Sequence, residues 1–365
     1  MNILFLTTHA NTGGITSYIL TLGQGLVKAG HKVWVVSSGG DCVPRMEAVG
    51  MKHVKINIRT KSEVHPKLWS CIGPLNELIQ KEGIDIIHTQ TRVTQVLGFF
   101  LSRARGVNMV TTCHGFFRPR WFRKIFPCWG CAVIAISKPV AEHLKMDFNV
   151  PPAKVHLIPN GIDLDRFVKV TGETRSSARQ KLNMGDAPLL GVIARLSDVK
   201  GIDVLIRAMP LILKQVLSVK LLVAGQGPEE ADLKELTQDL SLTDQVHFKN
   251  TIDQTQDLLP AFDVFVMPSL MEGLGLSVME AQACGIPVVA SRVGGLVDLI
   301  EDGKSGFLVP VNDPATLADR IIKLIQDPAK AKMMADQARS NIEKCFTAEL
   351  MLKQTLRIYE QYSCR

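Results

Sequence analysis

The chain has 365 residues, 46% of them hydrophobic and 21% charged, which allows a sizeable core and suggests two domains or one large one. This composition excludes a largely disordered protein. The formal net charge of +7 favours anionic partners, whether phosphorylated substrates, acidic lipid surfaces or nucleic acid, and does not choose among them.

The N-terminal apolar run indicates a first strand rather than a signal peptide, because it lacks a basic segment and stops at Thr7. No stretch reaches the roughly 18 consecutive apolar residues of a membrane-spanning helix. We therefore expect a cytoplasmic protein whose eight cysteines are reduced. Cys128 and Cys131 form a CxxC pair, but the sequence lacks the second pair of a zinc site and the surroundings of a redox site.

Short apolar runs alternate with longer amphipathic stretches through the first half of the chain. Strands are predicted at residues 3–7, 32–36, 84–88, 109–113, 132–136 and 155–158. Helices are predicted at residues 15–29, 67–81 and 94–105, with another from Ser137. Because the apolar runs are near-continuous rather than alternating, they indicate a parallel sheet with helices on both faces.

The same pattern restarts in the second half. Strands are predicted at residues 189–194, 220–224, 246–248, 264–267, 287–290 and 306–309. Helices between them include residues 202–214, 277–284 and 314–326. The polar stretch 169–177 follows a turn-rich segment, which places a domain boundary between residues 161 and 187. Two doubly wound halves imply a ligand cleft at the carboxyl ends of the strands.

Two loops are candidates for binding an anion. Residues 11–15 join the first strand to the first helix, and the glycines before Ile15, among them Gly14, let a phosphate approach free backbone amides. A plain tight turn explains this segment equally well. In the second half, Arg195 follows a strand and Lys200 precedes a helix, so both cations can neutralise a diphosphate leaving group.

The strongest motif is the glycine-rich loop 268–275 with the helix that follows it. Glu272 lies in the loop, and Glu280 lies one turn into the helix, in an otherwise apolar segment. A carboxylate there can accept hydrogen bonds from vicinal hydroxyls, although a helix-dipole role remains the simpler alternative. His114 follows the strand at 109–113, and the carboxyl end of a parallel strand is well placed for a cleft, although taken alone a packing or surface role is the commoner one for a histidine. His88 is interpreted as structural.

Together these motifs resemble glycosyltransferase family 4, whose members are retaining enzymes of the GT-B fold, here of the type that builds bacterial cell-surface glycans. The resemblance covers nearly the whole chain. It rests on residues 13–14, 114–115, 158–163, 195–201, 225–228, 272–280 and 294–295. Glu272 and Glu280 match the family's E-x(7)-E motif.

The resemblance implies an α/β fold of two Rossmann-like domains that face each other across a cleft. Residues 1–168 would form an acceptor-side domain and residues 169–347 a nucleotide-sugar domain. The C-terminal helix, residues 348–365, would pack back onto the first domain.

The resemblance also assigns roles within the donor site. Glu272 would contact the transferred sugar and Glu280 the ribose, while Arg195 and Lys200 would hold the diphosphate. Backbone amides of the loop would help them, from Gly273, Leu274, Gly275 and Leu276.

Further roles follow from the resemblance, as do three departures from it. Gly14 would line the phosphate side, His114 would belong to the acceptor side of the reaction centre, and the strand end at Asn250 would face the nucleobase. Gln90 stands where many relatives have a second histidine, Asn250 where glycine is usual, and Asp298 where glutamate is common.

The sequence therefore predicts a retaining glycosyltransferase that uses a nucleotide diphosphate sugar and no metal or other cofactor. It offers no clear enzymic nucleophile, and the resemblance suggests same-face attack by the acceptor. The alternatives are a sugar-nucleotide epimerase of the same fold and a non-catalytic sugar-nucleotide binder. Nucleic acid is suggested by charge alone, and no recognised motif supports it.

The composition of residues 116–129 predicts peripheral contact between the protein and the anionic inner face of the cell membrane. These residues combine six aromatic residues and four cations with no acid. The expected acceptor is therefore a lipid-linked saccharide or a lipopolysaccharide precursor, with a soluble acceptor as the alternative. The competing interpretation is that the aromatic rings are core residues and the cations are merely solvated.

Overall fold

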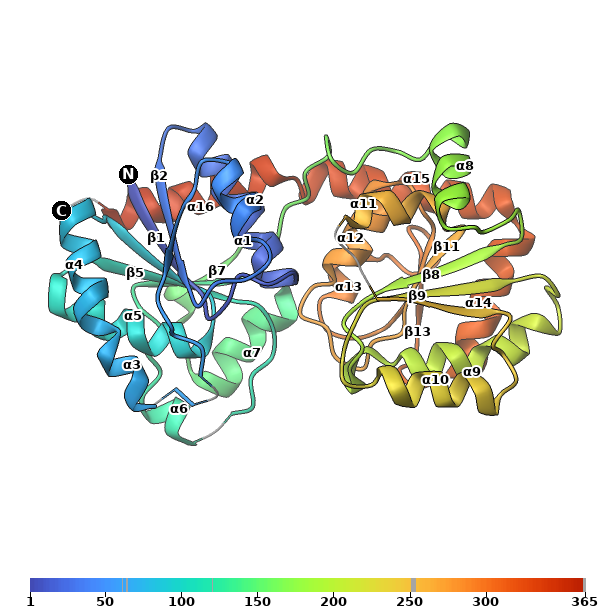
Figure 1. Cartoon of the computed structure of the whole chain (residues 1–365), viewed down its shortest axis with the longest axis horizontal. Helices are drawn as coiled ribbons and strands as arrows, with labels where there is room; N and C mark the ends of the chain where they lie inside the picture. Colours follow the sequence, from blue (N-terminus) through green and yellow to red (C-terminus); the bar gives the residue numbers. More distant parts are fainter. Residues whose placement is uncertain (61, 64, 120, 251–253, 364–365) are drawn as a thin grey trace. The chain divides into compact units, whose positions relative to one another are not determined.

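The structure is a computed structural model that describes the whole chain except residues 61, 64, 120, 251–253 and 364–365 (Figure 1). It divides into two compact units, one made of Met1–Gly161 with Thr347–Arg365 and the other of Ile162–Phe346. The boundary expected after residue 168 lies a few residues inside the second unit. There Phe167 is buried, and the Ile162 amide donates to the carbonyl oxygen of Phe346 at 2.8 Å.

The N-terminal unit is a parallel seven-stranded sheet in the order β3-β2-β1-β4-β5-β6-β7. Its strands are β1 (Asn2–Leu6), β2 (Lys32–Ser37), β3 (Lys52–Lys55), β4 (Ile86–Thr89), β5 (Asn108–Cys113), β6 (Ala132–Ala135) and β7 (Val155–Leu157). Its helices are α1 (Gly14–Lys28), α2 (Val43–Ala48), α3 (Pro66–Ser70), α4 (Ile72–Glu82), α5 (Arg92–Arg105), α6 (Trp121–Ile125), α7 (Lys138–Phe148) and α16 (Ala348–Ser363), with a short 3-10 turn at Pro152–Lys154.

Alternate residues of each central strand face opposite cores, which explains the continuous apolar runs in the sequence. Ile3 and Phe5 of β1 pack with α1 and α16, whereas Leu4 and Leu6 pack with α4 and α5. Figure 1 shows α16, in red, lying against this unit beside α1. Tyr359 of α16 is fully buried, so the C-terminal helix is part of the N-terminal core.

The C-terminal unit is a parallel six-stranded sheet in the order β10-β9-β8-β11-β12-β13. Its strands are β8 (Leu189–Ile193), β9 (Lys220–Ala224), β10 (Val246–Lys249), β11 (Val264–Met267), β12 (Val288–Ser291) and β13 (Phe307–Val309). Its helices are α8 (Gly172–Lys181), α9 (Ile202–Leu213), α10 (Glu230–Asp239), α11 (Thr255–Leu258), α12 (Leu276–Ala283), α13 (Leu296–Leu299), α14 (Pro314–Gln326) and α15 (Pro328–Cys345), with 3-10 turns at Asp198–Lys200 and Leu259–Ala261.

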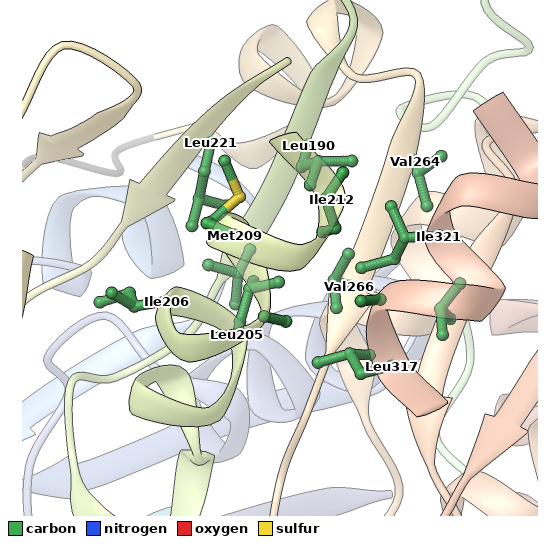
Figure 2. Close-up of a cluster of buried hydrophobic side chains, with 14 of the residues drawn as sticks. Leu190, Leu205, Ile206, Met209, Ile212, Leu221, Val264, Val266, Leu317 and Ile321 are labelled. Carbon is green, nitrogen blue, oxygen red and sulfur yellow. The ribbon is translucent and has the colours of Figure 1, made fainter. Parts of the chain in front are cut away.

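The core of the C-terminal unit lies between its sheet and the helices α9 and α14. In Figure 2, Leu317 and Ile321 of α14 point toward Val264 and Val266 of β11, and the side chains of α9 lie beside β8 and β9. This packing fixes the strand ends that carry the charged motifs.

Two sequence expectations need correction. The stretch 67–81 forms two helices that meet at Cys71 rather than one. The polar stretch 169–177, where only a domain boundary was expected, runs into α8. The hydrophobic pattern could not indicate this helix because almost all of its residues are polar. Arg175 and Arg179 hold it by donating to the two carboxylate oxygens of Asp263, each at 2.5 Å.

In the described part of the chain, no helix combines the length and the apolarity needed to cross a membrane.

Candidate active site

The charged motifs of the C-terminal unit meet at the ends of two neighbouring strands, β8 and β11, which pair in parallel. The backbone amides of Leu270 and Met271 donate to the carbonyl oxygen of Val199 at 2.8 and 3.3 Å and so join the two loops. Gly201 allows this approach, because a Cβ there would lie 2.2 Å from the carbonyl oxygen of Pro268.

Lys200 and Glu272 form an ion pair at this junction. Lys200 Nζ donates to Glu272 Oε2 at 2.5 Å, and Ser269 Oγ donates to the same oxygen at 3.3 Å. Arg195, by contrast, is exposed and has no hydrogen-bond or ion-pair partner among the described residues. The donors of Arg195 therefore remain available to an anion.

The loop between β11 and α12 ends in a helix N-terminus that no side chain caps. Gly275 lies before the helix with a φ of 99°, a left-handed conformation that favours glycine. The first turn, which begins at Leu276, contains no acidic residue, so its partial positive charge is not compensated there. Leu274 is buried, and Gly295 packs so closely that a Cβ on it would lie 2.3 Å from the carbonyl oxygen of Gly273. This end of α12 is suited to an anion.

Glu280 lies half-buried on α12 beside groups that the sequence did not single out. Burial raises its pKa from 4.5 to about 7, against the opposing effects of a hydrogen bond with Thr255 and the charge of Arg166. The Arg166 guanidinium donates through Nε and Nη2 to Gln256 Oε1 at 3.0 and 2.8 Å. Arg166 and Thr255 are far from Glu280 in the sequence, and no local pattern marks either of them.

Asn250 stands exposed at the end of β10. Its Nδ2 donates to Glu230 Oε1 at 3.0 Å, and Lys234 donates to the same oxygen at 2.7 Å. Hydrogen bonds from Lys234 and Asn250 lower the pKa of the Glu230 carboxyl. The structure thus places Asn250 against α10, two strands away from the Lys200–Glu272 pair in the sheet order.

In the N-terminal unit, Gly14 is the first residue of α1, and the loop before it is tied to the chain after β2. The backbone amide and the hydroxyl of Thr12 donate to the carboxylate of Asp41 at 2.7 and 2.8 Å. Burial of the Asp41 carboxyl is outweighed by these bonds, so its pKa is lowered. The first turn of α1 has no acidic residue and no side-chain cap. This is consistent with the phosphate role expected of Gly14 and with a simple turn.

His114 follows β5 and lies among neutral polar groups. Its Nε2 is 2.8 Å from Gln90 Oε1, at the end of β4, and its ring packs edge-on against Tyr18 of α1 at a centroid distance of 4.9 Å. Burial lowers the pKa of His114 to about 3 and keeps its ring neutral.

His88 belongs to the core, as the sequence indicated. Its Nδ1 is 2.5 Å from the Tyr359 hydroxyl, and its Nε2 is 2.7 Å from Thr112 Oγ1, which in turn lies 3.1 Å from the Tyr18 hydroxyl. Burial and then the proximity of His114 lower the pKa of His88 to about 3. This network ties α16 to the sheet beneath His114.

The CxxC cysteines have the surroundings of core thiols. Cys128 is buried, and burial raises its pKa to about 11, while Cys131 donates to the carbonyl oxygen of Met109. High thiol pKa values oppose thiolate chemistry. Among the described residues no group of three or more His, Cys, Asp or Glu side chains is arranged to hold a metal ion. The expected independence of metal stays a prediction.

Residues 116–129 only partly match the surface expected from their composition. Trp129 is buried, and Arg92 anchors the segment by donating to the carbonyl oxygen of Pro127. Arg123 donates to Glu63 Oε2 at 3.2 Å. Five described residues of the segment are exposed: Arg118, Pro119, Trp121, Lys124 and Ile125. Arg120 and the side chain of Phe122 lie outside the described parts.

The fold and these motifs define a class of two-unit α/β transferases, and comparisons with known proteins agree. The model of the family described as "Glycosyltransferase Family 4" matches residues 12–166, and that of "Glycosyl transferases group 1" matches residues 174–341. The chain is 30% identical to a D-inositol 3-phosphate glycosyltransferase from Salinispora arenicola, over 90% of this chain and 83% of that protein.

Two further comparisons bear on the chemistry and the fold. A GDP-mannose-dependent alpha-(1-6)-phosphatidylinositol monomannoside mannosyltransferase from Mycolicibacterium smegmatis is 35% identical over 52% of each chain. The crystal structure of Anabaena HepE in complex with UDP and glucose superposes with a TM-score of 0.88, at 22% identity, over 99% of this chain and all of that one. The chain belongs to glycosyltransferase family 4 and has the GT-B fold.

Proposed function

We propose that this glycosyltransferase moves a sugar from a nucleotide diphosphate donor to a saccharide acceptor with retention of the anomeric configuration. The observation that carries the proposal is the cluster at the ends of β8 and β11. There the Lys200–Glu272 pair lies at 2.5 Å and Arg195 is left without a partner among the described residues. A diphosphate has the charge that these two cations and the N-terminus of α12 suit.

In this proposal the leaving diphosphate takes over Lys200 from Glu272. Lys200 and Arg195 then neutralise the negative charge that grows on the leaving oxygen, which is where electrostatic stabilisation lowers a barrier. Glu272, released from its ion pair, accepts hydrogen bonds from hydroxyls of the transferred sugar. Catalysis thus consists of holding the leaving group and positioning the acceptor on the same face.

Glu280 serves the ribose of the donor in the proposal. Its carboxyl group lies half-buried beside Thr255 and Arg166, where two vicinal hydroxyls would find acceptor oxygens. Glu280→Gln should weaken the affinity for the free nucleoside diphosphate, whereas Glu272→Gln should act on the transferred sugar. Equal nucleotide affinity in wild type and Glu280→Gln would contradict the ribose role.

The test of the reaction is a screen of isotopically labelled UDP- and GDP-sugars with saccharide acceptors, followed by NMR of the product's anomeric centre. Transfer with an unchanged anomeric configuration supports the proposal, and an inverted product contradicts retention. Release of nucleotide with an altered free sugar and no need for an acceptor would identify the epimerase alternative.

We also propose that the acceptor is lipid-linked, as a lipopolysaccharide precursor is, and that the N-terminal unit binds an anionic membrane on its cytoplasmic face. The supporting observation is the short helix α6, whose first and last residues, Trp121 and Ile125, are 73% and 72% exposed and which also carries the exposed Lys124. Large exposed apolar side chains next to a cation suit a headgroup interface. The mycobacterial relative acts, by its name, on a phosphatidylinositol mannoside.

Co-sedimentation with vesicles of phosphatidylglycerol and phosphatidylcholine tests the membrane proposal. Wild type should sediment at low salt, and the triple variant Trp121→Ser, Lys124→Ser, Ile125→Ser should stay in the supernatant with its nucleotide affinity intact. Arg123 is left unchanged because it pairs with Glu63. Leu217→Ser is the matched control, since Leu217 is an exposed apolar residue of the C-terminal unit. Wild type that fails to bind these vesicles would favour a soluble acceptor.

A further inference from the structure

His114 and Gln90 form a hydrogen-bonded pair whose chemistry the family motifs leave open. His114 Nε2 lies 2.8 Å from Gln90 Oε1, and an amide oxygen can only accept a hydrogen bond. The proton of the neutral ring is therefore on Nε2. Nδ1 carries the lone pair and has no hydrogen-bond partner among the described residues. It is not one of the fully buried polar atoms without a partner, so it is accessible.

Gln90 is held beside His114 although its own side-chain amide is only partly hydrogen-bonded. It is 2% exposed, and its backbone amide donates to the carbonyl oxygen of Leu6 at 3.0 Å, which fixes it at the end of β4. Its Nε2 is buried and without a partner. An unpartnered buried amide nitrogen destabilises a fold, and such exceptions call for an explanation in the function of the side chain.

We propose that Gln90 is a positioning residue that holds His114 in the Nε2-protonated tautomer, so that Nδ1 accepts a hydrogen bond from a hydroxyl of the bound saccharide. The inference rests on the proposed glycosyl transfer, which supplies the saccharide. The hydroxyl belongs either to the acceptor or to the transferred sugar.

The surroundings of the ring hold it in this state. Tyr18 packs edge-on against it, and the Tyr18 hydroxyl lies 3.1 Å from Thr112 Oγ1. Among the described residues, the titratable groups that interact with His114 are Tyr18 and His88. Burial lowers the pKa of His114 to about 3, and burial together with the proximity of His114 lowers that of His88 to about 3. No carboxylate of the described residues contributes to the pKa of His114, so a neutral amide partner leaves the ring neutral at physiological pH.

The first experiment needs no substrate. Nitrogen-15 NMR of the histidine rings in the free enzyme reports the tautomer, and the signal missing from His114→Asn identifies His114 among the nine histidines. We expect the Nε2-protonated tautomer in wild type and a mixture of tautomers in Gln90→Met. An Nδ1-protonated ring in wild type would mean that the amide is turned round and would overturn the proposal, whatever reaction the enzyme performs.

The second experiment measures the pH dependence of transfer. Gln90→Glu places a carboxylate against Nε2–H and raises the pKa of His114. The kcat/KM of this variant should therefore fall tenfold per pH unit on the acid side of the profile. The double variant Gln90→Glu, His114→Asn should lack this fall. Gln90→Met should lower kcat/KM about three- to tenfold without that fall. Gln245→Met, in the C-terminal unit, is the matched control. An unchanged profile in Gln90→Glu would overturn the proposal.

Steady-state constants identify the substrate whose hydroxyl Nδ1 contacts. A rise in the acceptor KM of Gln90→Met at constant donor KM would assign the hydroxyl to the acceptor. A rise in the donor KM at constant acceptor KM would assign it to the transferred sugar. No change in kcat or in either KM would contradict the proposal.

Discussion

Both units carry polar side chains at the carboxyl ends of their parallel strands, but these side chains are neutral in one unit and charged in the other. At the N-terminal sheet, His114, Gln90 and Tyr18 form a neutral, hydrogen-bonded cluster in which burial keeps the imidazole uncharged. At the C-terminal sheet, Lys200 and Glu272 form an ion pair, with Arg195 exposed on the same strand end.

In the proposed reaction, the two sheet ends perform two different tasks. A developing negative charge is stabilised by fixed cations and a helix N-terminus, so charges gather where the leaving group is expected to bind. A hydroxyl needs a directed hydrogen-bond acceptor of defined protonation state instead. The neutral cluster supplies that, because its pKa values lie far from physiological pH.

The largest expected effect comes from removing the cations at the end of the C-terminal sheet. Arg195→Ala and Lys200→Ala should each lower kcat/KM for transfer about ten- to hundredfold, because each removes a charge-assisted hydrogen bond to phosphate worth about 1.5–3 kcal/mol. Steady-state kinetics measures this. Lys323→Ala, an exposed lysine on α14 that pairs with Asp319, is the matched control. Near-normal kinetics in both site variants would remove the assignment.

A smaller effect concerns Glu280, whose charged form is disfavoured by burial. Burial raises its folded pKa from 4.5 to about 7, so the native state keeps a proton that the unfolded state releases. The free energy of unfolding should therefore fall as pH rises from about 4.5 to 7, by about 1–3 kcal/mol once solvent access to this half-buried group is allowed for.

Urea unfolding of wild type and Glu280→Gln at pH 5 and pH 8 isolates this contribution. The variant cannot ionise, so it should gain stability relative to wild type at pH 8 and not at pH 5. Glu349→Gln, an exposed acid at the start of α16, is the control and should leave the difference at zero. A relative gain at pH 5 instead would reverse the assigned sign.

The smallest expected effect is that of removing metal ions. If Arg195, Lys200 and the end of α12 supply the positive charge, transfer rates should be unchanged after treatment with EDTA. Activity that disappears in EDTA and returns with magnesium or manganese would show that the cations of the chain are insufficient.

The repeating strands and the charged motifs could be read from the sequence, because continuous apolar runs and glycine-rich loops are local signals. The edge strand β3 was missed since its ends, Lys52 and Lys55, are exposed and polar. Helix α8 was missed because ion pairs to Asp263 hold it rather than a broad apolar face.

The neighbours of the site residues were harder to predict than the residues themselves. Lys200 and Glu272 were both singled out, yet their direct pairing depends on β8 lying next to β11. Arg166 near Glu280 and Tyr18 against His114 come from distant segments. Sequence spacing carries no information about such contacts, because packing of the whole unit creates them.

The most direct test of the account is calorimetric binding of a nucleoside diphosphate, UDP or GDP, to variants of the two sheet ends. We predict that Arg195→Ala, Lys200→Ala loses at least tenfold in affinity, while Gln90→Met binds as wild type does. Unchanged affinity in the double variant, together with weaker binding in Gln90→Met, would contradict the division between a charged donor side and a neutral saccharide side.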